Sequence, residues 1–117
     1  MPLMLTGDTR TNKKGDVDYL TAIVKQCSKD AAIGGAKALA NRPDRMALIA
    51  SIKVPTLILV GLFDAVYPIE IAQMMQQTIP GSVLHVVPGA AHAAIFENAD
   101  DSGTAIADWA AKMKTAN

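Results

Sequence analysis

The sequence predicts an α/β fold built on two parallel strands, at about residues 56–60 and 83–87, with flanking helices. Both segments are short apolar runs without alternation, which is typical of strands buried on both faces of a parallel sheet. The segment between them has helical periodicity, and a strand, a helix and a second strand form a βαβ unit. We therefore expect the two strands to be adjacent and parallel.

Composition and charge limit the class of protein. The chain has 117 residues, half of them apolar, which suits one domain with a core. Its 11 basic and 11 acidic residues form no block of one sign, so we expect neither a nucleic acid nor a membrane partner. The longest apolar stretches reach only about half of the roughly 20 residues that a membrane-spanning helix needs. The lone cysteine, Cys27, cannot form an internal disulfide, so the cytoplasm is the expected location.

Helices are predicted ahead of the first strand. Residues 1–15 show little periodicity and are predicted to be irregular. Asp16 is a suitable N-cap for an amphipathic helix, and a second helix is predicted over about residues 30–40. Gly34 and Gly35 in its middle cost about 1 kcal/mol each, so we expect close packing against another backbone there. The apolar face of the first helix comprises Val17, Leu20, Ile23, Val24 and Cys27.

Prolines divide the second half of the chain into elements. Pro55 ends a short helical segment that begins near Met46, and Pro68 suits the first position of a helix that Pro80 terminates. A final amphipathic helix follows the second strand, with an apolar face of Ile106, Trp109, Ala110 and Met113. The predicted order of this half is strand, helix, strand, helix.

Each predicted strand is followed by a loop that carries an ionisable residue. Asp64 lies in the loop after the first strand, and His92 lies in the loop after the second. Neighbouring parallel strands are about 4.8 Å apart, so these loops can bring the carboxylate and the imidazole into contact. A carboxylate bonded to one ring nitrogen fixes the tautomer and leaves the other nitrogen free as a base. This pair would supply two members of a catalytic triad.

Motifs around these two residues resemble the α/β-hydrolase family. The run Val54–Asp64 resembles the strand and loop that carry the family's catalytic acid. The segments Ile79–Ser82 and Val87–His92, with Glu97 beyond them, resemble the part that delivers the catalytic histidine. The spacing between the acid and the histidine is also the family's usual one. The resemblance implies that Asp64 and His92 are the catalytic acid and histidine.

The resemblance extends over nearly the whole chain. Residues 42–44, Arg-Pro-Asp, resemble the exit from the helical cap of the family. The chain is thus interpreted as a single truncated domain, with a cap-like helical segment at 1–43 and a βαβα core segment at 44–117. The resemblance thus implies a partial α/β-hydrolase fold, which corresponds to the C-terminal part of the family's domain and lacks its N-terminal strands.

The sequence also departs from the family pattern. Phe63 and Ala65 flank the acid where many relatives carry an acidic residue and a proline, and Ala91 stands where they place a glycine. The larger departure is that no G-x-S-x-G occurs, which is the turn that presents the nucleophilic serine. We expect no metal and no cofactor.

The serines and the cysteine are the alternative candidates for the nucleophile. Ser102 is a weak candidate on the same side as the pair, although its place at the start of the last helix favours an N-cap. Ser51 and Ser82 precede strands and should lie at the opposite end of the sheet. Ser28 or Cys27 would lie above the site if the cap helices fold over it, but Cys27 is interpreted as a buried apolar contact.

Other polar motifs have plainer interpretations. His85 is expected to be packed or exposed within a strand rather than functional. Glu97 is expected to form a salt bridge or a hydrogen bond to a loop. Gly7-Asp8 and the Gly34-Gly35 pair lack the strand-turn-helix context of a phosphate loop, so nucleotide binding is not expected.

We expect an enzyme that hydrolyses carboxylic esters, with a small-molecule ester as substrate. Two alternatives remain open: a non-catalytic remnant that acts as an assembly or binding module, and a fragment that complements a separate serine-bearing chain. If the chain begins at Met1, the edge of strand 56–60 is unpaired, and such edges recruit partners. We therefore expect a homo-oligomer, a dimer in the simplest case, that completes the sheet through this edge.

Overall fold

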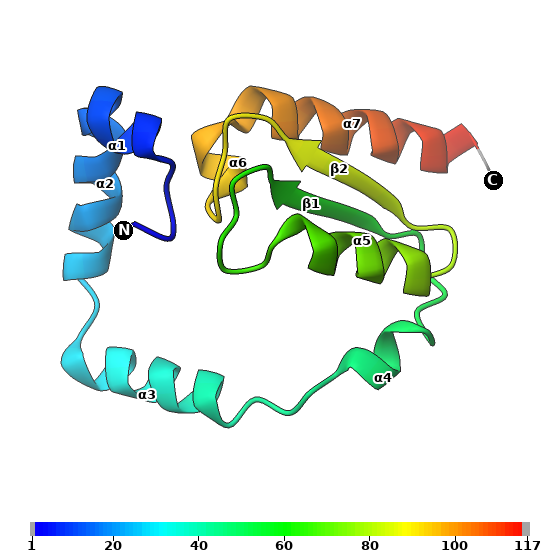
Figure 1. Cartoon of the computed structure of the whole chain (residues 1–117), viewed down its shortest axis with the longest axis horizontal. Helices are drawn as coiled ribbons and strands as arrows, with labels where there is room; N and C mark the ends of the chain where they lie inside the picture. The colour runs from blue at the N-terminus through cyan, green and yellow to red at the C-terminus, as the bar shows by residue number, and fades with distance from the viewer. Residues whose placement is uncertain (1, 116–117) are drawn as a thin grey trace.

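The computed structural model describes residues 2–115. This part of the chain alternates helices with two strands (Figure 1). The elements are α1 (Gly7–Asn12), α2 (Lys14–Lys25), α3 (Lys29–Ala40), α4 (Met46–Ile49), β1 (Leu57–Gly61), α5 (Ile69–Thr78), β2 (Val83–Val87), α6 (Ala94–Glu97) and α7 (Ala99–Thr115).

The two strands form a parallel pair, as predicted. Leu57 lies opposite Val83, and the register continues to Gly61 opposite Val87. The second strand has the predicted bounds, and the first begins and ends one residue later than expected. Because the strands are parallel, their carboxyl ends lie at the same end of the sheet, where the loops that carry Asp64 and His92 begin (Figure 1).

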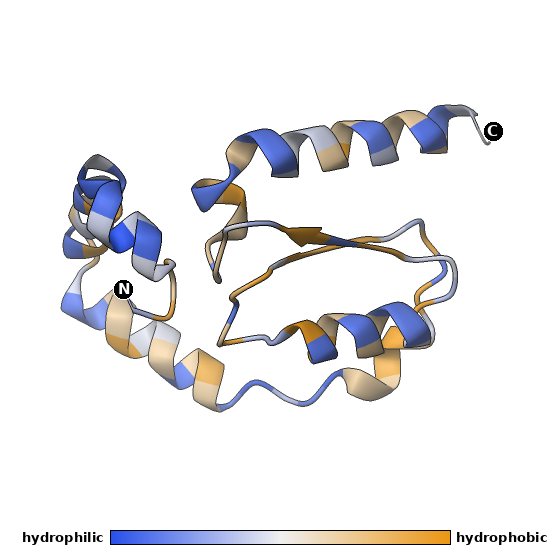
Figure 2. Ribbon diagram, turned by 45° about the horizontal axis from the view of Figure 1, so that its top comes forward, coloured by the Kyte–Doolittle hydropathy of each residue, from blue (hydrophilic) through white to orange (hydrophobic). Residues whose placement is uncertain are grey.

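Helices cover both faces of this small sheet, which explains why the strands read as continuous apolar runs. On one face, alternate residues of β1 pack with α5 and its C-terminal end: Ile58, Val60, Ala72 and Ile79. On the other face, Leu59 packs against a second buried group formed by Val87, Ala90 and Ala94. Figure 2 shows both strands as apolar segments between more polar helix surfaces.

The N-terminal segment is helical, which corrects the prediction of an irregular lead-in. The Thr6 side chain accepts a hydrogen bond of 3.1 Å from the Thr9 N–H and caps α1. Leu5 and Thr9 are buried, so this segment is anchored by packing that sequence periodicity does not reveal. Asp16 is not the N-cap of α2, because α1 leads almost directly into α2 through Lys13.

Helix α3 differs from its prediction in its surroundings. Its side chains are exposed along its whole length, and it lies apart from the sheet in both ribbon views (Figures 1 and 2). A Cβ added to Gly34 or Gly35 would meet no atom within 4 Å in the described part of the chain, so the expected close packing is absent there. Cys27, in the turn before α3, is exposed rather than buried.

The helices in residues 2–115 include none that is long and apolar enough to cross a membrane.

Candidate active site

The loops that follow β1 and β2 are held against each other by main-chain hydrogen bonds. The Leu62 N–H donates to the Val87 carbonyl at 3.0 Å, and the Phe63 N–H donates to the Ala90 carbonyl at 2.9 Å. The first bond continues the parallel ladder, and the second ties the acid loop to the histidine loop. These main-chain bonds hold the two loops together independently of the contact between the Asp64 and His92 side chains.

Gly61 allows this close approach. A Cβ built at Gly61 would lie 2.0 Å from the Ala91 carbonyl oxygen and 2.6 Å from that of Ala90. Both neighbours are backbone atoms, so they cannot move aside as a flexible side chain can. Gly61 does not have a positive φ, since only Gly81 and Gly89 do among the described residues. Glycine is therefore required at position 61 by the lack of space and not by the backbone conformation.

Asp64 uses both carboxylate oxygens. Oδ1 accepts hydrogen bonds from the Val66 and Tyr67 N–H groups at 2.8 and 2.9 Å, and Oδ2 lies 2.9 Å from His92 Nδ1. Only 7% of the Asp64 side chain is exposed. Burial would raise the pKa of this carboxyl, but the hydrogen bonds from Tyr67, His92 and Val66 outweigh it and hold the pKa below its ordinary value. Asp64 is thus a preorganised carboxylate.

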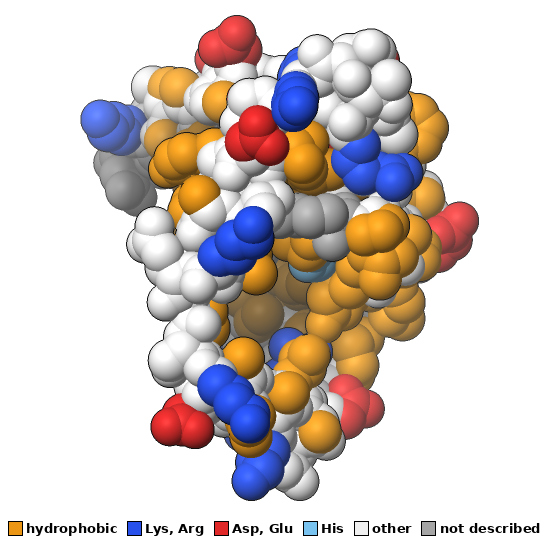
Figure 3. Space-filling view, turned by 90° about the vertical axis from the view of Figure 1, so that its left-hand side faces the viewer, with side chains coloured by type: hydrophobic (Ala, Val, Ile, Leu, Met, Phe, Trp, Pro, Cys, Tyr) orange, Lys and Arg blue, Asp and Glu red, His pale blue; other side chains and the backbone are white. Residues whose placement is uncertain are grey.

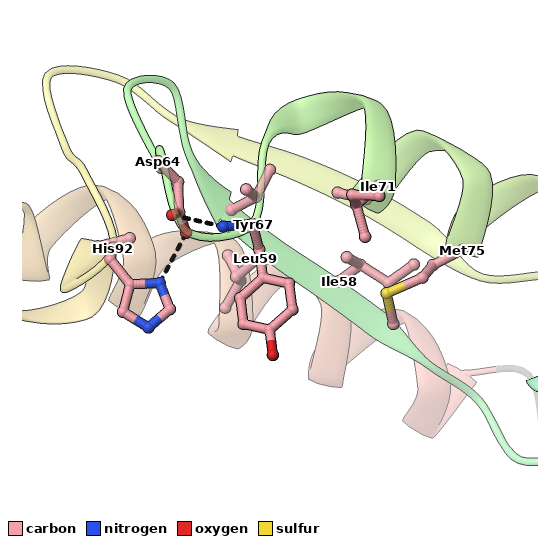
Figure 4. A pocket seen from close by; sticks show the side chains of 11 residues that line it. Ile58, Leu59, Asp64, Tyr67, Ile71, Met75 and His92 are labelled. Atoms are coloured by element: carbon pink, nitrogen blue, oxygen red, sulfur yellow. Dashed lines mark hydrogen bonds and ion pairs between the residues drawn. The ribbon is translucent and has the colours of Figure 1, made fainter. Parts of the chain in front are cut away.

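His92 is oriented by this carboxylate. An ionised Asp64 can only accept a hydrogen bond, so in the neutral imidazole Nδ1 carries the proton and Nε2 has the lone pair. The Tyr67 ring stacks beside the imidazole at a centroid distance of 5.9 Å, and the Tyr67 hydroxyl accepts a bond of 2.7 Å from Arg42 Nη2. Figure 4 shows Asp64 above the imidazole, joined to it by a dashed line, and the second ring nitrogen on the side away from Asp64. The free nitrogen is available as a base.

A mostly apolar cavity of about 250 Å³ adjoins the pair. Asp64, Tyr67 and His92 lie on its wall, and the rest of the lining comes from β1, α5 and Ala94 (Figure 4). Apolar side chains also surround a hollow on the face that Figure 3 presents. An apolar surround of this kind suits a small organic molecule with a few polar contacts.

Ser102 is not the N-cap of the last helix, which corrects that prediction. Helix α7 begins at Ala99, and Asn98 accepts a bond of 3.3 Å from the Asp101 N–H. Ser102 lies one turn into the helix, is fully buried, and its Oγ has no hydrogen-bond partner among the described residues. A substrate in the cavity cannot reach a hydroxyl with no exposed surface.

The side chains of the other three serines bond to nearby main-chain groups. Ser28 caps α3 by accepting a bond of 3.1 Å from the Ala31 N–H. Ser51 and Ser82 donate to carbonyl oxygens of the preceding turns. Among residues 2–115, no hydroxyl or thiol forms a hydrogen bond with His92.

The structure also brings together residues that the sequence did not link. His85 is half-buried on β2, where it was expected to be either packed or exposed. Its Nε2 lies 2.6 Å from Asp101 Oδ2 on α7. Glu97 bonds to a loop: Oε2 accepts from the Ala91 N–H at 2.6 Å, and Oε1 accepts from the Thr6 N–H at 2.7 Å. The contact between Thr6 and Glu97 joins residues 91 positions apart in the sequence, and no pattern in the sequence predicted it.

The part of the chain that the structure describes holds no group of three or more potential metal ligands.

Comparison with known proteins gives one informative similarity. No protein-family model matches the chain. A solved structure of a thermophilic esterase from Thermogutta terrifontis, with malate bound, is similar to it, with a TM-score of 0.90 and 31% sequence identity. The match covers 95% of this chain and 41% of that chain. The chain therefore spans less than half the length of the esterase that it resembles.

Proposed function

Because the chain has the fold of the C-terminal part of an α/β-hydrolase, we propose that it acts in the hydrolysis of carboxylic esters, with His92 as general base and Asp64 as its orienting carboxylate. One observation carries this proposal. The bond of 2.9 Å between His92 Nδ1 and Asp64 Oδ2 leaves Nε2 free beside an apolar cavity. Such a site suits an uncharged ester.

In the proposed reaction, Nε2 takes a proton from an attacking oxygen as that oxygen bonds to the ester carbonyl carbon. The Asp64 carboxylate stabilises the imidazolium that forms, without itself taking the proton. The imidazolium then gives its proton to the alkoxide oxygen as the carbon–oxygen bond breaks. With water as the attacking oxygen, the products are the acid and the alcohol, and the histidine returns to its starting state.

The attacking oxygen in this proposal comes from water or from a hydroxyl supplied by another residue or subunit. The sequence has no G-x-S-x-G, and Ser102 is buried. Removing the nucleophile of a serine protease costs about 10⁶ in kcat. Attack by water alone should therefore be slow and should favour esters with good leaving groups, which demand less protonation.

Within residues 2–115, β1 pairs only with β2, and its other edge supports association of two copies. Thr56 O and Leu62 N bond to β2, so in a parallel ladder the intervening odd residues direct their N–H and C=O groups to the other edge. A two-stranded sheet is marginal alone. We propose that two β1 edges pair about a two-fold axis. Light scattering should then give twice the chain mass, and a stable monomer at micromolar dilution would contradict the dimer.

A second candidate function uses the same edge. Leu59 and Gly61 line the cavity that His92 also lines. A strand from another polypeptide paired along β1 would thus end close to Nε2, where it could deliver a serine. In this case the chain complements a separate serine-bearing chain. Adding such a chain should then raise ester hydrolysis well above the sum of the two components measured alone.

The test of the proposed function is hydrolysis of a short-chain nitrophenyl ester by the parent protein, His92→Ala and Asp64→Ala. His85→Ala is the matched control, because His85 is the only other histidine and pairs with Asp101 outside the cavity. Each variant must keep the parent circular dichroism spectrum. We expect loss of activity with His92 or Asp64 and retention in the control. Activity that survives His92→Ala would overturn the proposal.

A further inference from the structure

We propose that Glu97 is a positioning residue that sets the His92 loop against Asp64 and couples it to the N-terminal segment Met4–Thr9. This inference builds on the proposed role of His92 and adds a residue that touches neither the cavity nor the imidazole.

The Glu97 carboxylate joins two segments that are far apart in sequence. Oε2 accepts the Ala91 N–H at 2.6 Å, and Oε1 accepts both the Thr6 N–H at 2.7 Å and the Thr6 hydroxyl at 3.0 Å. One oxygen therefore holds the residue before His92, while the other holds the cap of α1. A shift of either segment would leave a carboxylate oxygen unpaired.

The Glu97 carboxylate is held by hydrogen bonds, because Lys13 Nζ donates to the Glu97 main-chain carbonyl at 3.4 Å and forms no ion pair with the carboxylate. The side chain is buried, and among residues 2–115 no lysine, arginine or histidine forms an ion pair with it. Burial would raise its pKa, but the Ala91 and Thr6 N–H groups and the Thr9 and Thr6 hydroxyls outweigh it and lower the pKa. Charge-assisted hydrogen bonds are about twice as strong as neutral ones, and losing one in a buried site is costly. Glu97 is thus held as an anion by these groups.

The His92 backbone is fixed on both sides by these contacts. Before it, the Ala90 carbonyl accepts from Phe63 and the Ala91 N–H donates to Glu97. After it, the Ala93 N–H donates to the Met4 carbonyl at 2.8 Å. The imidazole therefore reaches Asp64 from a loop in which three residues that flank His92 are hydrogen-bonded, and two of these bonds go to Glu97 or to the N-terminal segment.

Glu97→Gln tests this role with little change of shape. A carboxylate has two acceptor oxygens, whereas an amide has one, so the NH₂ of Gln would face either the Ala91 or the Thr6 N–H. Glu70→Gln is the matched control, because Glu70 is the other glutamate and is exposed on α5. If Glu97 positions the loop, only the first replacement should disturb His92.

The readout is the ¹⁵N imidazole spectrum, which needs no ester and so stays informative even if the hydrolysis proposal fails. The chain has two histidines, and variants at each assign the signals. In the parent, His92 should carry its proton on Nδ1. In Glu97→Gln its population should move toward the Nε2–H form while His85 is unchanged. An unchanged His92 spectrum in folded Glu97→Gln would overturn the proposal.

Thr6→Ala keeps the inference testable if Glu97→Gln does not fold. It removes the hydroxyl bond to Glu97 and the side-chain cap of α1 but keeps the main-chain bonds of Glu97 to Thr6 and Ala91, so His92 should shift in the same direction by a smaller amount. No shift would count against the coupling. Where the parent hydrolyses an ester, Glu97→Gln should lower kcat by up to about 10²-fold with KM little changed, the cost of misplacing a catalytic group by about 1 Å.

Discussion

Asp64 Oδ2 lies 2.9 Å from His92 Nδ1, while Oδ1 of the same carboxylate closes the loop that carries it through the Val66 and Tyr67 N–H groups. One side chain therefore folds its own loop and orients the base on the neighbouring loop. The carboxylate is positioned before a substrate arrives, and it needs no reorganisation when the imidazole becomes charged.

Asp64→Asn should keep the loop but lose the base. The amide oxygen can still accept from Val66 and Tyr67, whereas its NH₂ would face His92 Nδ1 and favour the wrong tautomer. The same replacement in a serine protease costs about 10⁴ in kcat. We expect ester hydrolysis to fall by the same order with the fold intact, measured by initial rates and circular dichroism. A fall of less than about tenfold would argue against orientation by Asp64.

Gly61→Ala should destabilise the protein and displace the histidine loop. The new Cβ would overlap the Ala91 carbonyl, and overpacking of this kind costs about 1–3 kcal/mol or more. Gly34→Ala is the control, because its Cβ meets open space in a helix and should add about 1 kcal/mol of stability. Urea unfolding of both variants checks this. Equal effects at the two positions would mean that the two loops do not pack as described.

Ser102→Ala should stabilise the chain and leave any activity unchanged. Its Oγ is buried and has no hydrogen-bond partner within residues 2–115, and alanine is the better helix former. The expected gain in the free energy of unfolding is roughly 1 kcal/mol. Thermal unfolding and ester hydrolysis measure the two effects. Loss of activity in the stabilised variant would restore Ser102 as a candidate nucleophile.

Stability should fall on acidification through the two lowered carboxyl pKa values. The folded state lowers the pKa of Glu97 below 4.5 and that of Asp64 below 3.8. Each ionised carboxylate therefore contributes its full stabilisation of the folded state at a pH above its ordinary pKa. This contribution is lost as the pH falls through the lower native pKa. The urea midpoints of the parent and Glu97→Gln should differ by a constant amount from pH 8 to 6 and converge below about pH 4.5. A difference that does not depend on pH would contradict an ionised Glu97.

The sequence predicts the core of this structure well, because its signals there are local. The apolar runs at 56–60 and 83–87 place both strands to within one residue, and strand polarity brings Asp64 to His92. Both faces of these strands are covered by helices, which agrees with their continuous apolar sequence.

The remainder depends on contacts that no local pattern records. Thr6 and Glu97 are bonded across 91 positions of sequence, and this anchors a segment with no clear periodicity. The sequence predicts Ser102 as the N-cap of the last helix, but the Asn98 side chain accepts the hydrogen bond from the first turn of that helix instead. The cap-like interpretation of residues 1–43 stays a prediction, and so do the nucleophile and the oligomer.

The chain holds one cysteine and one tryptophan, and they lie in different parts of the fold. Cys27 is exposed at the turn between α2 and α3, and Trp109 is half-buried on α7. A single thiol-reactive dye would therefore form a resonance-energy-transfer pair with the natural indole, with no residue changed. Transfer efficiency in such a labelled sample would measure directly whether α2 and α3 swing toward the sheet when an ester or a second chain binds.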